Sequence, residues 1–212
     1  MKRLRFIALI VAILLAGGLA LHLFQSREPP YQGRSLVEWM DDYGRASASA
    51  SDVEMEISRQ AVKQIGTNAI PFLLKELSAK DTALQERLKL WLQRQPLVQF
   101  HFKYAWEHRL QGLEGFAILE QDASCAVPDL VELSRDNDAD IRRGALNVLC
   151  IIKPKQDILL PILLQAFHDP SAPNRETAAI RLHRLYPDEA AKAGVYKKYP
   201  TLERSNRDSS LK

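Results

Sequence analysis

The chain has few of the residues that mark a catalytic or metal-binding protein. It contains 2 Cys and 5 His among 212 residues, and their spacing does not match a metal-ligand motif. None of its 9 Gly belongs to a glycine-rich phosphate loop, and no G-x-S-x-G nucleophile motif is present. The histidines are His22, His101, His108, His168 and His183. We therefore predict no enzyme activity, no cofactor and no metal site.

An excess of charge is also missing from most of the chain. The 29 Lys and Arg residues exceed the 26 Asp and Glu residues by three, and Lys2, Arg3 and Arg5 account for that whole difference. The remainder is neutral, so it has no surplus of cations with which to displace counterions from phosphates. We therefore predict that the chain does not bind nucleic acid.

Residues 6–24 are the one long apolar run, and they contain no charged residue apart from a proton that His22 could carry. As a helix this run reaches roughly 28 Å, which is close to the hydrocarbon thickness of a bilayer. A cleaved signal peptide has a shorter apolar core of about 7 to 15 residues followed by a small-residue site. The length favours an uncleaved transmembrane anchor, with a cleaved signal or a buried core helix as the alternatives.

The basic residues before this run predict its orientation. Residues 1–5 carry three cations, and positive charge stays on the cytoplasmic side of a membrane. The N-terminus is then inside, and the rest of the chain lies outside the cytoplasmic membrane, in the periplasm if the source is a bacterium. Secretion after signal cleavage is the alternative localisation.

A stretch of the C-terminal half is repeated. The segment from Pro128 to Leu149 recurs 33 residues later from Pro161 to Leu182. The identical pairs are Pro128/Pro161, Leu130/Leu163, Asp136/Asp169, Ala139/Ala172, Arg142/Arg175, Ala145/Ala178 and Leu149/Leu182. A fixed period between about 20 and 50 residues is typical of a solenoid. Asp and Arg that recur in each unit predict contacts between stacked units, since a catalytic residue would occur once.

Each copy predicts two helices joined by a polar loop. A proline opens the first helix, because its fixed φ and missing N–H suit the first helical position. The second helix begins near Ile141 or Asn174 and places apolar residues on one face. Neither helix buries its apolar face alone, so the units must stack on one another.

The unit x-V-P-x-L-x-x-L…D-x-D-x-x-I-R-x-x-A-L-x-x-L, found at 126–149, resembles a HEAT repeat, the helical hairpin of α-solenoid proteins. The third unit departs from it, with Asn174 in place of an aliphatic residue and with Pro170 and Pro173 in its loop. With the basic start, the apolar span and an E-P-x-Y-x-G-R-x-L-x-x-W segment, the chain resembles uncharacterised membrane-anchored HEAT-repeat proteins of bacteria. The resemblance implies an all-α solenoid and brings no activity with it.

The remaining segments complete the predicted domain organisation. A short extended stalk covers 25–34, the HEAT-like domain covers 35–193, and a flexible tail covers 194–212. The pairs Ser35/Glu38 and Ser51/Glu54 predict capping boxes at two helix starts. Gly66 predicts a left-handed helix end, and Pro71 opens a further repeat helix.

An insertion near 80–110 separates Pro71 from Pro128 by more than one period. It predicts a helix around 84–92, a break at Gln95-Pro96 and then an aromatic stretch that leads into a helix ending near Leu119. Two interpretations of the aromatics are open: a satellite core under the loop, which we favour, or the lining of a groove. The aromatic residues are Trp91, Phe100, Phe102, Tyr104 and Trp106.

Two further expectations concern binding and cysteine chemistry. The HEAT resemblance implies that the helices opened by Pro71, Pro128 and Pro161 line a concave face, and their outward residues are Lys75, Asp129, Glu132 and Gln165. We predict a protein-binding scaffold there, and keep a HEAT-like enzyme of the lyase or glycosylase type and a purely structural envelope protein as alternatives. Cys125 and Cys150 could form a disulfide in an oxidising compartment, but two separate buried thiols are favoured.

Overall fold

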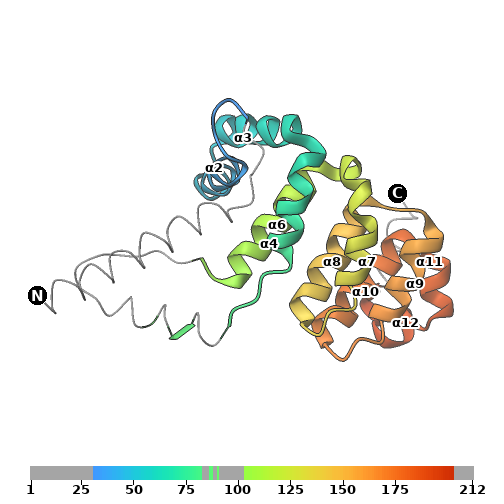
Figure 1. The fold of residues 1–212 in the computed structure, drawn as a ribbon. Helices are drawn as coiled ribbons and strands as arrows, with labels where there is room; N and C mark the ends of the chain where they lie inside the picture. The colour runs from blue at the N-terminus through green and yellow to red at the C-terminus, as the bar shows by residue number, and fades with distance from the viewer. Residues whose placement is uncertain (1–30, 83–85, 88–89, 91–102, 203–212) are drawn as a thin grey trace, which may run out of the picture.

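A computed structural model describes residues 31–82, 86–87, 90 and 103–202 (Figure 1). Within these ranges the chain is all-α, as predicted, and its β-type contact is an isolated bridge between Tyr31 and Arg34. The elements of the N-terminal half are α2 (Leu36–Ser49), α3 (Asp52–Ile65), η1 (Gly66–Ala69), α4 (Ile70–Leu77) and α6 (Ala105–Leu119). Those of the C-terminal half are η2 (Glu120–Ala126), α7 (Val127–Leu133), α8 (Ala139–Ile152), α9 (Gln156–Ala166), α10 (Ala172–Leu185), α11 (Pro187–Lys192) and α12 (Val195–Lys198).

The capping box predicted at the start of α2 is confirmed. The backbone N–H of Ser35 donates to Glu38 at 2.7 Å, and that of Glu38 donates to the Ser35 hydroxyl at 3.3 Å. The box predicted at Ser51 is wrong, because the Ser51 side chain makes no capping bond. Ala50 instead takes a left-handed conformation, with φ of 54°, and the Ser51 N–H returns to the carbonyl of Ala46 at 3.0 Å. Backbone bonds therefore fix the tight α2–α3 connection.

The α2–α3 pair forms the N-terminal end of the described fold. Leu36, Trp39 and Met40 are buried, as their helical spacing predicts, and α2 packs on α3. The indole N–H of Trp39 donates to the carbonyl of Tyr31 at 3.1 Å. Tyr31 and Arg34 exchange two backbone hydrogen bonds, so the end of the predicted extended stalk is a turn held against α2.

The repeat prolines do not all occupy the same place. Pro71 and Pro128 lie in the first turns of α4 and α7, as predicted. Pro161 lies inside α9, which begins at Gln156, so the prediction that it opens a helix is wrong. Proline has no N–H, so the carbonyl of Asp157 lacks its usual helical hydrogen bond. Both residues are exposed, so water can bond this carbonyl instead.

Two glycines control the central part of the fold. Gly66 ends α3 with a positive φ of 61°, but its ψ of −137° lies outside the left-handed helical region that we predicted.

Gly112 lies where α6 crosses α4. A Cβ atom there would meet the backbone nitrogen of Leu77 at 2.8 Å and the carbonyl oxygen of Leu73 at 2.9 Å. The two helix backbones can approach this closely because position 112 has no side chain.

The C-terminal half keeps the 33-residue period in its helices. α8 runs from Ala139 to Ile152, and α10 runs from Ala172 to Leu185, so both bounds shift by one period. Each begins two residues before the predicted start. α8 packs on α6, α7 and α10, and Figure 1 shows the labelled helices α7 to α12 gathered at the C-terminal side of the molecule. Most of their buried apolar residues belong to one core cluster that extends to the α2–α3 pair.

The predicted flexible tail is wrong from residue 194 to residue 202. Val195 is fully buried at the start of α12, and Tyr199 lies near Phe167, with ring centroids 6.3 Å apart. Tyr196, Tyr199 and Leu202 also pack against the core. A few well-placed apolar residues therefore hold a segment whose average composition is polar.

Several predictions fall outside the described residues. These are the basic start and apolar span at 1–24, the first part of the stalk at 25–30, most of the predicted 84–92 helix, Phe100, Phe102 and the last part of the tail at 203–212. None of the helices in the described part has the length and apolar character needed to cross a membrane. The helix predicted to end near Leu119 is confirmed as α6.

Candidate functional site

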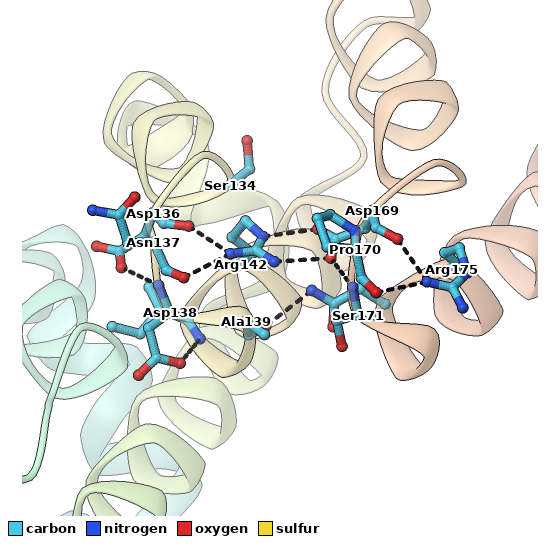
Figure 2. A network of polar contacts seen from close by, with 12 residues as sticks. Ser134, Asp136, Asn137, Asp138, Ala139, Arg142, Asp169, Pro170, Ser171 and Arg175 are labelled. Carbon is cyan, nitrogen blue, oxygen red and sulfur yellow. Dashed lines mark hydrogen bonds and ion pairs between the residues drawn. The ribbon is translucent and has the colours of Figure 1, made fainter.

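The loops that begin α8 and α10 have the same polar construction (Figure 2). In the first loop, the Asp136 carboxylate accepts from the backbone N–H of Asp138 at 2.7 Å. In the second, the Asp169 carboxylate accepts from the backbone N–H of Ser171 at 2.7 Å. Asp and Ser side chains favour such local bonds over continued helix. The same turn is therefore built twice, one period apart.

Arg142 joins these two loops. Its Nη1 donates to the carbonyls of Asp136 and Asn137 at 2.8 and 3.0 Å. Its Nε and Nη2 donate to the two carboxylate oxygens of Asp169 at 2.7 and 2.8 Å. Figure 2 shows the guanidinium between the loops, directed at both. The planar fork of arginine matches a carboxylate in this two-bond geometry.

The same pattern extends in both directions along the chain. Before it, Lys80 Nζ donates to both carboxylate oxygens of Asp136 at 2.9 and 3.0 Å. After it, Arg175 Nη1 donates to the carbonyls of Asp169 and Pro170 at 2.8 and 2.7 Å. A cation that precedes each loop therefore binds the aspartate of that loop, and the predicted contact between repeated Asp and Arg is confirmed for Arg142 and Asp169.

These contacts shift the acidity of both aspartates. The hydrogen bonds from Arg142 lower the pKa of Asp169 to about 2, against the opposing effect of burial. The backbone N–H of Asp138, followed by the Lys80 ammonium, lowers the pKa of Asp136. Asp169 raises the pKa of Arg142 in turn. Both carboxylates are therefore ionised at neutral pH. We call this series of contacts, from Lys80 and Asp136 through Arg142 and Asp169 to Arg175, the ladder.

A cleft of about 610 Å³ opens beside the ladder. Arg142, Asp169 and Gln165 line it, and Arg135 and His168 are exposed members of its lining. Asn174, which departs from the HEAT pattern, is buried there. Its Nδ2 donates to the Ala139 carbonyl at 3.0 Å, while its buried Oδ1 has no hydrogen-bond partner. The asparagine thus ties α10 to the start of α8 and leaves one acceptor beside the cleft.

The four residues predicted to bind a partner are all exposed. Lys75 lies on α4, Asp129 and Glu132 lie on α7, and Gln165 lies on α9. Among the described residues, no hydrogen bond or ion pair joins any two of these side chains. Only Gln165 lines the cleft. The structure therefore places the four residues on three separate helices and leaves their side chains accessible.

A second groove, of about 690 Å³, lies between α2 and α6. Trp106, with 59% of its surface exposed, and Leu110 line it opposite Met40 and Ala48. For Trp106 the favoured satellite core is wrong, and the alternative of a groove lining fits. Trp91, Phe100 and Phe102 lie outside the described residues.

Polar residues at this groove were not found from the sequence. Asp41 accepts from Lys103, and also from Gln111 Nε2 at 2.9 Å. Asp41 and Gln111 are 70 residues apart, so no local spacing signals their contact. Glu114 also lines the groove, and burial raises the pKa of its carboxyl. On the next face of α6, His108 Nδ1 lies 2.6 Å from the buried carboxylate of Glu76.

The cysteines form no disulfide. Both are free thiols, as predicted, but Cys125 is exposed and only Cys150 is buried. Burial raises the pKa of the Cys150 thiol to about 11, so this group is a poor nucleophile at neutral pH. Cys125 lies in η2, whose short turn leaves its side chain at the surface.

Comparisons with protein-family models, curated proteins and solved structures find no match for this chain. The candidate function therefore rests on the ladder, the cleft and the groove. In the described ranges no three His, Cys, Asp or Glu side chains are grouped so that they could hold a metal ion. What the arrangement offers is an accessible surface of mixed charge on helices that the ladder fixes relative to one another.

Proposed function

We propose that this protein is a membrane-tethered scaffold that binds another exported protein and has no catalytic activity of its own. The observation that carries the proposal is the bond between Arg142 and Asp169, which joins two helical hairpins that follow one another in the sequence repeat. Repeated hairpins that contact their neighbours in this way build extended surfaces, and such surfaces commonly serve for protein binding.

The scaffold is a HEAT-like α-solenoid in this proposal. The 33-residue offset between the bounds of α8 and α10 supports it, and so do the contacts of α8 with both α6 and α10. The Lys80–Asp136 pair extends the ladder toward α4. In this proposal, Lys80 connects the region after α4 to the α7–α8 hairpin, just as Arg142 connects the α7–α8 hairpin to the next hairpin.

Residues 6–24 supply the tether. Their apolar length and the three cations before them support a single span with the N-terminus inside and the repeat domain outside, in the periplasm of a bacterium. Alkaline extraction of membranes tests this. The full-length chain is expected in the pellet with Met1 retained, and a soluble form that begins between Gly18 and Gln25 supports the alternative of secretion after cleavage.

The partner is tested by capture from membranes solubilised in mild detergent, with the tag at the C-terminus of the full chain. One protein recovered in near-equal amount supports the scaffold. Recovery of no stoichiometric protein, with and without prior cross-linking, contradicts it and favours a structural role in the envelope. Variants at the four exposed residues then show whether that capture uses the proposed face.

A further inference from the structure

An apolar groove lies at the N-terminal end of the described fold, between the Tyr31 turn and α3. Its volume is about 530 Å³, and its lining is almost entirely apolar in accessible surface. Val53 is 72% exposed and Ile57 is 55% exposed, and both line it. They are four residues apart on α3 and therefore share one face of that helix. Tyr31 and Trp39 form its other side.

The groove is open to solvent, and its lining contains no cation. The polar residues in its lining are Gln32, Asp52, Glu56 and Gln60, and none of these is a cation. The nearby guanidinium of Arg34 is already engaged, because it lies 4.1 Å above the Trp39 ring and pairs with Asp42. Contiguous exposed apolar surface of this kind marks a site of contact with another protein or with a membrane.

The chain length before Tyr31 decides between those partners. This step rests on the proposed tether at 6–24. Only residues 25–30 separate that span from Tyr31, and six residues reach at most roughly 20 Å when fully extended. The groove that Tyr31 lines therefore stays within roughly 20 Å of the bilayer, whereas α9 lies at the opposite side of the described fold (Figure 1).

We propose that this groove docks on the lipid surface, with Val53 and Ile57 inserted at the boundary between headgroups and acyl chains. The half-buried Tyr31 suits that boundary, where amphipathic rings are enriched. The rim residues Asp52 and Glu56 are acidic, and Glu56 pairs with Arg59 at 3.4 Å, so the rim does not attract anionic lipids and the contact is apolar. Docking fixes the orientation of the repeat domain relative to the membrane in addition to tethering it.

The test uses the full-length chain in vesicles of neutral phosphatidylcholine, with the exposed Cys125 replaced by serine. A single environment-sensitive fluorophore is attached through Val53→Cys, Ile57→Cys or Ile158→Cys. Ile158 is the matched control, since it is an exposed isoleucine on α9, away from the groove. Quenching is measured with aqueous iodide and with lipids that carry a nitroxide near the top of the acyl chain. Circular dichroism checks that each labelled chain is folded.

Docking predicts at least twofold stronger quenching by the nitroxide lipid at 53 and 57 than at 158, and at least twofold weaker quenching by iodide. Labels at 53 and 57 that are shielded from iodide but untouched by the lipid quencher overturn docking in favour of a second copy or of residues 25–30. Labels open to iodide at all three positions overturn docking outright. Co-sedimentation separates the two proposals: a chain that leaves the vesicles contradicts the tether and docking together, whereas a chain that stays without lipid quenching contradicts docking alone.

Discussion

Arg142 and Asp169 meet through two parallel hydrogen bonds, at 2.7 and 2.8 Å, although they belong to successive units of the repeat. The third nitrogen of the same guanidinium holds the loop of its own unit through the carbonyls of Asp136 and Asn137. One side chain therefore sets both the shape of a loop and its distance from the next. With 16% and 8% of the two side chains exposed, the pair is largely shielded from solvent.

Replacement of Arg142 by lysine is expected to lower the free energy of unfolding by about 2–3 kcal/mol. Lysine keeps the charge but lacks the planar fork, so both the pairing with Asp169 and the loop contacts are weakened. The neighbouring variant Arg143→Lys is the matched control. Arg143 pairs with Asp140 at the surface, where loss of a pair costs less than about 1 kcal/mol. Chemical denaturation of the full chain in detergent gives both values, and equal effects would show that the Arg142 fork is not the connection between the units.

The ladder also predicts how stability depends on pH. The pKa of Asp169 is about 2 in the folded chain, below the 3.8 of a free side chain, chiefly because Arg142 donates to its carboxylate. Ionised Asp169 therefore stabilises the fold above about pH 4, and this contribution, on the order of 2 kcal/mol, is lost as pH falls toward 2. Asp169→Asn removes it. The difference in unfolding free energy between the native chain and the variant is expected to shrink between pH 5 and pH 2.5, and a constant difference would contradict the assignment.

The close crossing of α4 and α6 predicts opposite effects at two helical glycines. Gly112→Ala is expected to destabilise the chain by about 1–3 kcal/mol, since the new methyl group meets backbone atoms of α4 that cannot rotate away. Gly44→Ala on α2 is the control, because nothing lies within 4 Å of a Cβ atom there. Alanine is a better helix former than glycine by about 0.5–1 kcal/mol, so this variant should unfold at a higher temperature. Thermal melting followed by circular dichroism compares them, and a stabilised Gly112→Ala would mean that the helices separate without cost.

The sequence predicted those features that depend on residues close together in the chain. The Ser35/Glu38 capping box and the prolines in the first turns of α4 and α7 depend on residues within a few turns of one another. The similar bounds of α8 and α10 follow from the likeness of two segments, which the sequence shows directly. The Arg142–Asp169 contact was also foreseeable, because a repeated pair signals a contact between units.

Distant contacts explain what the sequence did not reveal. Asp41 and Gln111 meet across 70 residues, and Tyr199 packs near Phe167 through tertiary contact alone. The unused cap at Ser51 has a local origin instead, since the left-handed Ala50 gives the turn an alternative set of backbone bonds to the end of α2. For the Asp41–Gln111 and Tyr199–Phe167 contacts, the complete fold determines where the partner lies, so no local pattern could signal them.

The exposed residues Lys75, Asp129 and Glu132 provide the last prediction, which concerns partner binding. Reversal of all three charges is expected to weaken capture of the partner at least tenfold, equivalent to about 1.4 kcal/mol, while the melting temperature stays nearly unchanged. The control reverses the exposed residues Arg184, Glu176 and Asp188, which changes the net charge by the same amount on other helices.

Capture is measured from detergent-solubilised membranes with equal amounts of each folded variant. Loss with the first set alone supports binding through α4 and α7, whereas equal loss with both sets indicates a general charge effect. Trp106→Ala probes the groove between α2 and α6, where the indole is exposed. If that variant abolishes capture and the charge reversals do not, the partner binds the groove, and the assignment of the binding face to Lys75, Asp129, Glu132 and Gln165 is wrong.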